Sequence, residues 1–138
     1  MMLRRDAKVE LLKRVPLFSE CSKKELGEIA QVADEIDVGP GKVLTSEGDS
    51  GREFFVLVEG AAEVRRNGRK VSTLGSGDFF GEISLVSQRP RTATVTMTAP
   101  GRLLVVTDRA FRELMRKLPS IQLKVLTALA DRLAADAV

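Results

Sequence analysis

Hydrophobic residues recur every three or four positions at both ends of this chain and gather in short runs between them. The wider spacing places apolar side chains on one face of a helix, whereas short runs rich in β-branched residues are typical of strands. We therefore predict helices over residues 8–14, 23–34, 109–118 and 120–135, on either side of a block of strands over residues 36–107. This order indicates an α+β fold.

Several predicted helices carry recognisable start or stop residues. Ser22 and Glu25 have the spacing of a capping box, in which the serine oxygen accepts from an early backbone N–H and the glutamate reaches back. Asp108 is expected to be the N-cap of the third helix. Pro119 ends that helix and opens the fourth.

The last predicted helix is apolar on more than one face. Its apolar residues are Ile121, Leu123, Val125, Leu126, Leu129, Ala130 and Leu133. A surface helix that buries a single stripe needs fewer apolar residues than this. Two interpretations stay open: a thoroughly buried terminal helix, or a helix that makes a second contact with a ligand or another subunit.

The central block contains short segments with strand character. They are residues 38, 43–45, 54–58, 62–64, 71–74, 94–97 and 103–106. Turn residues separate them, most clearly Asn67-Gly68, because both tolerate the positive φ angles of a type I′ hairpin. Many short strands at close spacing favour an antiparallel sandwich, barrel or jelly roll.

Composition narrows the class of protein. The 138 residues suffice for one domain, and 43% hydrophobic with 30% charged residues is typical of a globular protein. A net charge of +3 permits an anionic ligand without requiring nucleic acid or a membrane. The single cysteine, Cys21, fits a reducing cytoplasm. Charges interrupt residues 1–15, so we expect neither a signal peptide nor a membrane span.

Missing residue types exclude several kinds of chemistry. Without histidine the chain has no imidazole base and no Ser-His-Asp triad, and a histidine-bearing metal site of the cupin type is nearly excluded. Without tryptophan or tyrosine it lacks the commonest platforms for stacking single-stranded nucleic acid. No P-loop pattern occurs. We therefore expect no enzyme, no metal and no cofactor.

Residues 77–95 combine the parts of an anion site. Gly81 precedes a segment that Pro90 keeps short, and the first turn of a helix presents free backbone N–H groups. Arg91 adds a planar fork of donors, and Glu82 is an acid that suits a ribose hydroxyl beside the phosphate. Two interpretations remain: a nucleotide-phosphate site, or an acid that favours a helix start and pairs with the arginine.

Two segments carry a resemblance to a known family. Residues 80–95 read FGEISLVSQRPRTATV, and residues 44–60 read LTSEGDSGREFFVLVEG. The first resembles the phosphate-binding cassette of the cyclic nucleotide-binding domain family, which includes protein kinase regulatory subunits, nucleotide-gated channels and the catabolite activator. The second is similar to the family's first signature, except that Thr45 stands where an aliphatic residue is commoner.

The resemblance implies an antiparallel eight-stranded β roll, a jelly-roll-like double-stranded β-helix, flanked by N-terminal helices and two C-terminal helices. In this layout residues 1–138 form one domain, with an N-terminal helical segment over 1–35 and the roll over 36–107. The cassette lies at 79–95, and the C-terminal helices occupy 108–138.

The resemblance also implies roles for the cassette residues. The backbone N–H groups of Ile83 and Ser84 are expected to bind the cyclic phosphate together with Arg91. Glu82 is expected to accept from the ribose 2′-hydroxyl, and Gly81 to allow close approach. The expected ligand-binding residues are Gly81, Glu82, Ile83, Ser84, Arg91, Thr92 and Ala93, followed by Phe80, Val64, Val71, Thr73 and Arg132.

Selectivity for the base depends on Thr92 in this comparison. A hydroxyl residue directly after the cassette arginine can meet the amino group of a syn guanine, whereas alanine there accompanies preference for cyclic AMP. We favour cyclic AMP, the dominant ligand of stand-alone bacterial-looking domains, and cyclic GMP stays open. Val64, Val71 and Thr73 are expected to line the base. Arg132 or Leu133, on the last helix, is expected to make the lid contact with the ligand.

The expected function is that of a cytoplasmic, allosteric sensor of a cyclic nucleotide that acts on an unknown effector protein. An interaction or dimerisation module of the same fold without ligand is the alternative, with a homodimer formed through the last helix. No helix-turn-helix pair follows the strands, so we expect no direct DNA binding. The basic group Arg65, Arg66, Arg69 and Lys70 is interpreted as solvated hairpin charges.

Overall fold

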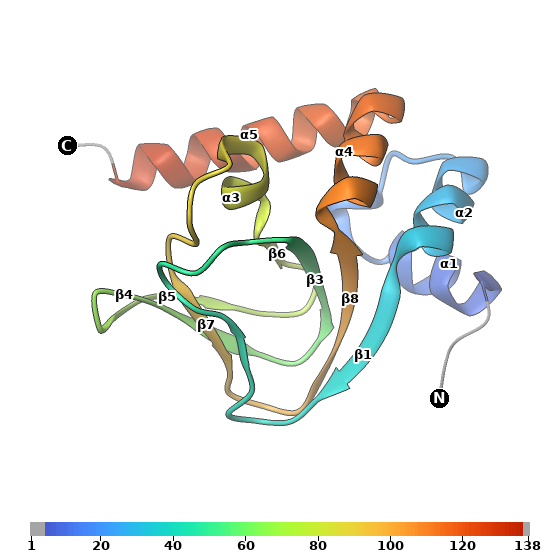
Figure 1. The fold of residues 1–138 in the computed structure, drawn as a ribbon. Helices are drawn as coiled ribbons and strands as arrows, with labels where there is room; N and C mark the ends of the chain where they lie inside the picture. The colour runs from blue at the N-terminus through green and yellow to red at the C-terminus, as the bar shows by residue number, and fades with distance from the viewer. Residues whose placement is uncertain (1–4, 137–138) are drawn as a thin grey trace.

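The chain folds into a β roll with helices packed against one side and one end of it (Figure 1). A computed structural model describes residues 5–136, and the side chains of all of these except residues 5, 6, 86 and 132–136. Helices α1 and α2 lie beside strand β1 in Figure 1, and helices α3, α4 and α5 lie above the strands.

The strands form two four-stranded antiparallel sheets. One sheet has the order β1-β8-β3-β6 and the other β2-β7-β4-β5. The strands are β1 (Asp34–Val38), β2 (Val43–Thr45), β3 (Glu53–Glu59), β4 (Ala62–Arg66), β5 (Arg69–Leu74), β6 (Phe79–Phe80), β7 (Thr94–Met97) and β8 (Gly101–Thr107). This is the eight-stranded roll that the resemblance implies.

The helices fall into an N-terminal group, one short helix between strands and a C-terminal pair. They are α1 (Arg5–Lys13), the 3-10 turn η1 (Pro16–Phe18), α2 (Lys23–Val32), α3 (Glu82–Ser87), α4 (Asp108–Lys117) and α5 (Pro119–Asp136). None of the helices in the described part of the chain is long and apolar enough to cross a membrane.

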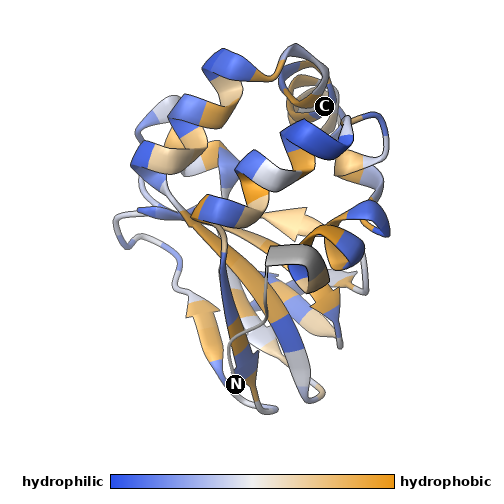
Figure 2. Cartoon of the chain, turned by 90° about the vertical axis from the view of Figure 1, so that its right-hand side faces the viewer, coloured by the Kyte–Doolittle hydropathy of each residue, from blue (hydrophilic) through white to orange (hydrophobic). Residues whose placement is uncertain are grey.

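Strand β3 is buried on both faces, which explains its unbroken apolar run. Phe54 and Val56 pack against the helices, whereas Phe55 and Leu57 point into the roll. Successive strand side chains point to opposite faces, so one strand serves two hydrophobic clusters. In Figure 2 the apolar strand segments continue upward into the layer of helices.

Local capping and turn chemistry agree with the sequence. Ser22 Oγ accepts from Glu25 N at 3.1 Å, and Glu25 Oε1 accepts from Ser22 N at 2.8 Å, which confirms the capping box. Asn67 and Gly68 have φ angles of 54° and 76°, as a type I′ hairpin requires. Pro119 opens α5 as predicted.

The N-cap of α4 is Thr107, so the prediction for Asp108 is wrong. Thr107 Oγ1 accepts from Ala110 N at 3.2 Å, and Asp108 is already the first helical residue. Thr107 is also the last residue of β8, paired with Glu53, and its backbone is extended as an N-cap requires. The end of the strand therefore decides between two neighbouring capping residues.

Two strands differ from the sequence prediction. Strand β1 begins at Asp34, two residues before the predicted block, and polar Glu35 fits there because Arg102 on β8 pairs with it at 3.0 Å. Strand β6, Phe79–Phe80, carries no strand pattern of its own and exists through pairing with β3.

Replacement of Ser22 tests the capping box. Because Ser22→Ala removes the acceptor of an early N–H, we expect the free energy of unfolding to fall by about 1 kcal/mol in urea denaturation. Ser76→Ala, at an exposed turn position, is the control and is expected to change stability by less than about 0.5 kcal/mol. Equal effects at both positions would contradict the capping role.

Candidate functional site

A cavity of about 640 Å³ opens between the β4–β5 hairpin and the segment that contains α3. Much of its lining is apolar, and its polar lining comes from β2, β4, β5, α3 and the loop before β7. The lining residues are Thr45, Val64, Arg66, Val71, Ser72, Leu74, Phe80, Gly81, Ile83, Ser84, Arg91, Thr92, Ala93 and Val95.

Arg91 is the buried charge of this cavity, with 8% of its surface exposed. Its Nη1 donates to Gly81 O and to Ser84 Oγ, both at 2.9 Å, and its Nη2 donates to Glu53 O at 2.7 Å. The guanidinium carbon also lies 5.9 Å from the centre of the Phe55 ring. The fork of donors is therefore held in one orientation from three sides.

The acceptors of these three bonds are neutral oxygens. Burial lowers the pKa of Arg91 from its ordinary value, and the charges of Glu53 and Glu82 raise it. An arginine nevertheless stays protonated near neutral pH. Glu53 and Glu82 offset part of this charge, but none of the described carboxylates accepts a hydrogen bond from the guanidinium group, so an anion in the cavity would gain charged hydrogen bonds from it.

The turn before β3 holds the backbone of Arg91 through two hydrogen bonds. Arg91 N donates to Asp49 O at 2.8 Å, and Gly48 N donates to Arg91 O at 2.9 Å. A Cβ on Gly51, in the same turn, would collide with Ser84 Oγ and lie 2.6 Å from Arg91 Nε. The glycine leaves the space that the guanidinium occupies.

Gly81 is the N-cap of α3 and adopts a φ of 96°, which few other residues tolerate. A Cβ there would lie 2.8 Å from Glu53 O and 2.9 Å from Arg91 Nη1. The absence of a side chain at Gly81 therefore leaves room for the guanidinium group of Arg91. The amides that follow are in the first helical turn, where backbone N–H groups have no intrahelical acceptor.

The comparisons with known proteins agree with this geometry. A family model described as cyclic nucleotide-binding domain matches residues 35–118. The chain belongs to the cyclic nucleotide-binding domain family. The matched range includes the turn at Gly48–Gly51 and the whole segment 79–95.

Relatives and solved structures of this family resemble the chain over most of its length. The chain is 39% identical over 127 residues to a cAMP-dependent protein kinase regulatory subunit of Mycosarcoma maydis. This alignment covers 86% of the chain and 24% of that subunit. The chain spans about a quarter of the length of the curated relatives it matches.

Two solved structures illustrate the shared fold. The regulatory domain of Toxoplasma gondii PKA, co-crystallised with cAMP, aligns with a TM-score of 0.81 and 24% identity, covering 92% of this chain and 50% of that one. The Thermus thermophilus catabolite activator protein aligns with a TM-score of 0.79 and 26% identity, covering 88% and 59%.

Most site residues expected from the sequence line the cavity. Those on its wall are Gly81, Ile83, Ser84, Arg91, Thr92, Ala93, Phe80, Val64 and Val71. Ser84 is 4% exposed and accepts a hydrogen bond from Arg91, and Thr92 is exposed at the opening. Phe80 stacks on Phe55 with ring centres 4.8 Å apart, which fixes the strand that leads into the cassette.

Two expected residues, Glu82 and Thr73, do not line the cavity, and a third has no described side chain. Glu82 is fully buried behind its wall. Thr73, on β5, is exposed and is not among the residues that line the cavity. Arg132 lies in α5, but its side chain is outside the described residues.

Sequence reasoning missed Thr45, Arg66, Ser72, Leu74 and Val95. Thr45 had a signal, since it departs from the family pattern: its buried Oγ1 donates to Ala93 O at 3.1 Å and so ties β2 to the cassette. No signal in the sequence marks Arg66 as a cavity residue, because it belongs to a group of charged residues interpreted as solvated.

Gly51→Ala tests how closely the turn packs on Arg91. We expect the added methyl group to displace Ser84 and Arg91 and to lower the free energy of unfolding by about 1–3 kcal/mol in urea denaturation. Gly39→Ala is the matched control, since a Cβ at Gly39 meets nothing within 4 Å. A Gly51→Ala protein as stable as the Gly39→Ala protein would contradict this packing.

Proposed function

We propose that this chain is a regulatory domain that binds cyclic AMP in the cavity beside Arg91 and signals occupancy through its C-terminal helices. The observation that carries the proposal is the buried guanidinium group of Arg91, held by neutral oxygens at the wall of an apolar cavity. A cavity of about 640 Å³ is of the size that small-molecule ligands occupy. The relatives named as cAMP-dependent kinase subunits support the choice of ligand.

In this proposal the cyclic phosphate binds to Arg91, to the first-turn amides of Ile83 and Ser84, and to the Ser84 hydroxyl group. Charged hydrogen bonds to phosphate replace the bonds that Arg91 makes to neutral oxygens, and they are the stronger kind. The apolar side chains of Val64 and Val71 line the space for the purine base.

Glu82 links binding to movement in this proposal. Its carboxylate is to accept from the ribose 2′-hydroxyl, yet it is fully buried behind the cavity wall. The proposal therefore includes a shift of α3 on binding, which brings this carboxylate to the nucleotide. Because α3 lies directly under α5 in Figure 1 and contacts it, such a shift acts on the C-terminal helix.

Helix α5 is tied to the N-terminal part by Lys124. Its Nζ donates to Pro16 O at 2.6 Å and to Ser19 Oγ at 2.7 Å. A ligand that moves α5 has to alter these bonds, and it shifts the equilibrium only by its differential affinity for the two arrangements. The proposed output is a change in how α5 and η1 contact an effector protein in the cytoplasm.

An interaction module without ligand is the second candidate function. Leu123 and Leu126 are 67% and 57% exposed and lie three positions apart, so they are neighbours on one face of α5. Both functions use the same helix, so a direct measurement of nucleotide binding separates them.

Arg91→Ala is the decisive variant for the proposed ligand. Loss of a charged hydrogen bond to a buried phosphate costs about 2–3 kcal/mol, so we expect the Kd for cyclic AMP to rise about 30-fold to 150-fold in isothermal titration calorimetry. Arg89→Ala removes an exposed arginine from the same loop and is expected to change the Kd less than about twofold.

Calorimetry also gives the result that would refute the assignment. Unchanged affinity of a folded Arg91→Ala protein would mean that the phosphate binds elsewhere. No binding of cyclic AMP or cyclic GMP by the unaltered protein would instead favour the interaction module.

A further inference from the structure

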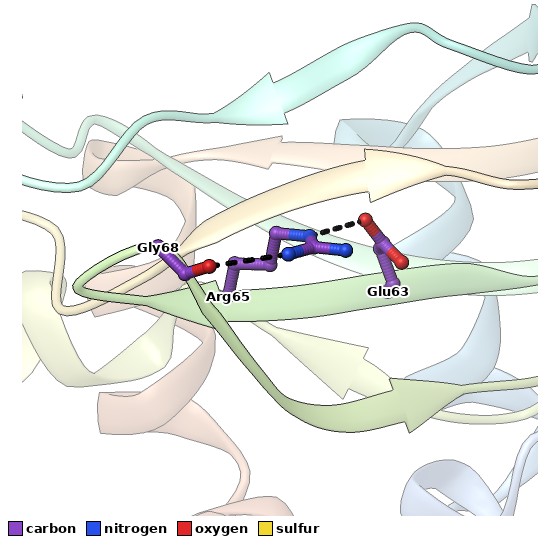
Figure 3. A network of polar contacts seen from close by, with 3 residues as sticks. All are labelled: Glu63, Arg65 and Gly68. Atoms are coloured by element: carbon purple, nitrogen blue, oxygen red, sulfur yellow. Dashed lines mark hydrogen bonds and ion pairs between the residues drawn. The ribbon is translucent and has the colours of Figure 1, made fainter.

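The two arginines at the end of β4 make different contacts. Arg65 is exposed, and it donates to Glu63 Oε1 at 2.6 Å and to Gly68 O at 3.2 Å, which are contacts within the β4–β5 hairpin itself (Figure 3). Arg66 is half-buried, lines the cavity, and donates from Nε to Thr92 O at 3.2 Å. The interpretation of Arg66 as a solvated charge is therefore wrong. Arg66 instead joins the hairpin to the segment before β7.

The tip of this hairpin lies beyond the paired part of the sheet. The pairing of β4 with β7 ends at Arg65 and Thr94, so residues 66–69 extend past the start of β7. Strand β5 is at the edge of the sheet and pairs with β4. It contributes three residues to the wall of the cavity, which are Val71, Ser72 and Leu74. The position of this wall therefore depends on what holds the hairpin tip.

Glu47, in the turn after β2, makes a second contact with the hairpin tip. Its Oε1 accepts from Asn67 N at 2.9 Å. The backbone of Glu47 is held in turn, because its N–H group donates to Thr94 Oγ1 at 2.9 Å. The next residue belongs to the same network, since Gly48 N donates to Arg91 O at 2.9 Å. Glu47 thus links the hairpin tip to the turn that also holds the backbone of Arg91.

We propose that Glu47 is a positioning residue for nucleotide binding, which keeps the β5 wall of the cavity in place relative to Arg91. This inference rests on the proposed function, because it concerns the same cavity. A binding site whose wall is already ordered loses less conformational freedom when a ligand binds. Glu47 is not among the residues that line the cavity, so it acts through the hairpin and affects different bases alike.

Glu47→Ala tests the proposal in calorimetric titrations of the full chain with cyclic AMP and with cyclic GMP. Because the variant loses one hydrogen bond to the hairpin, we expect both affinities to fall by about threefold to tenfold. Dissociation of a fluorescent cyclic AMP analogue, followed by stopped flow, is expected to accelerate by a similar factor. Removal of a negative charge by itself favours an anionic ligand, so this loss cannot come from the charge.

Two variants serve as controls. Glu47→Gln keeps the side-chain oxygen that accepts from Asn67, and its affinities are expected to stay within about twofold of those of the unaltered protein. Glu63→Ala removes the same charge from the same hairpin, but its carboxylate accepts from Arg65 in the network of Figure 3 and is likewise expected to change them less than about twofold.

Amide hydrogen exchange reports on the contact itself, without any nucleotide. Exchange of the Asn67 amide is expected to be faster in the Glu47→Ala protein than in the unaltered protein, because its acceptor is gone, and unchanged in the Glu47→Gln protein.

Several results would overturn the inference. They are unchanged affinities in the Glu47→Ala protein, an equal loss in the Glu47→Gln or Glu63→Ala protein, unchanged exchange of the Asn67 amide, or weaker binding of one nucleotide while the other binds as before. In each of these cases the unaltered protein still binds a cyclic nucleotide, and the proposed function stands. Absence of binding of both nucleotides by the unaltered protein would overturn both.

Discussion

The burial of one arginine organises the functional half of this domain. Arg91 joins β3 and the start of α3 through the carbonyl oxygens of Glu53 and Gly81, and it reaches the Ser84 hydroxyl group in the first turn of that helix. This arrangement requires that the neighbouring positions carry no side chain, and Gly51 and Gly81 meet this requirement. The turn at Gly48–Gly51 and the start of α3, which are far apart in the sequence, thus both pack around one buried cation.

A buried charge such as that of Arg91, whose hydrogen-bond acceptors are all neutral, can also transmit the effect of ligand binding to other elements. In the proposed function, an anion at Arg91 competes for the donors that now hold α3 and β3 together, and α3 shifts so that the buried Glu82 reaches the ribose. Because α3 contacts α5, and Lys124 ties α5 to η1, these short elements form a continuous path from the cavity to the helices. Ligand binding and conformational change would then both originate in the contact between Arg91 and the anion.

Local chemistry was predictable from the sequence, whereas side-chain environments set by the tertiary fold were not. The capping box at Ser22 and the turn at Asn67-Gly68 depend on neighbouring residues alone. Strand β6 depends on pairing with β3, and the position of Arg66 depends on how the hairpin folds over the cassette. Asp108 was mistaken for a cap because pairing across the sheet, invisible in the sequence, sets the end of β8.

A crystal structure of the chain with cyclic AMP would test the central claim most directly. We expect electron density for the nucleotide in the cavity, a phosphate oxygen within hydrogen-bond distance of the Arg91 guanidinium group, and α3 displaced so that Glu82 meets the ribose. A nucleotide bound with its phosphate away from Arg91, or an empty cavity in crystals saturated with cyclic AMP, would contradict it.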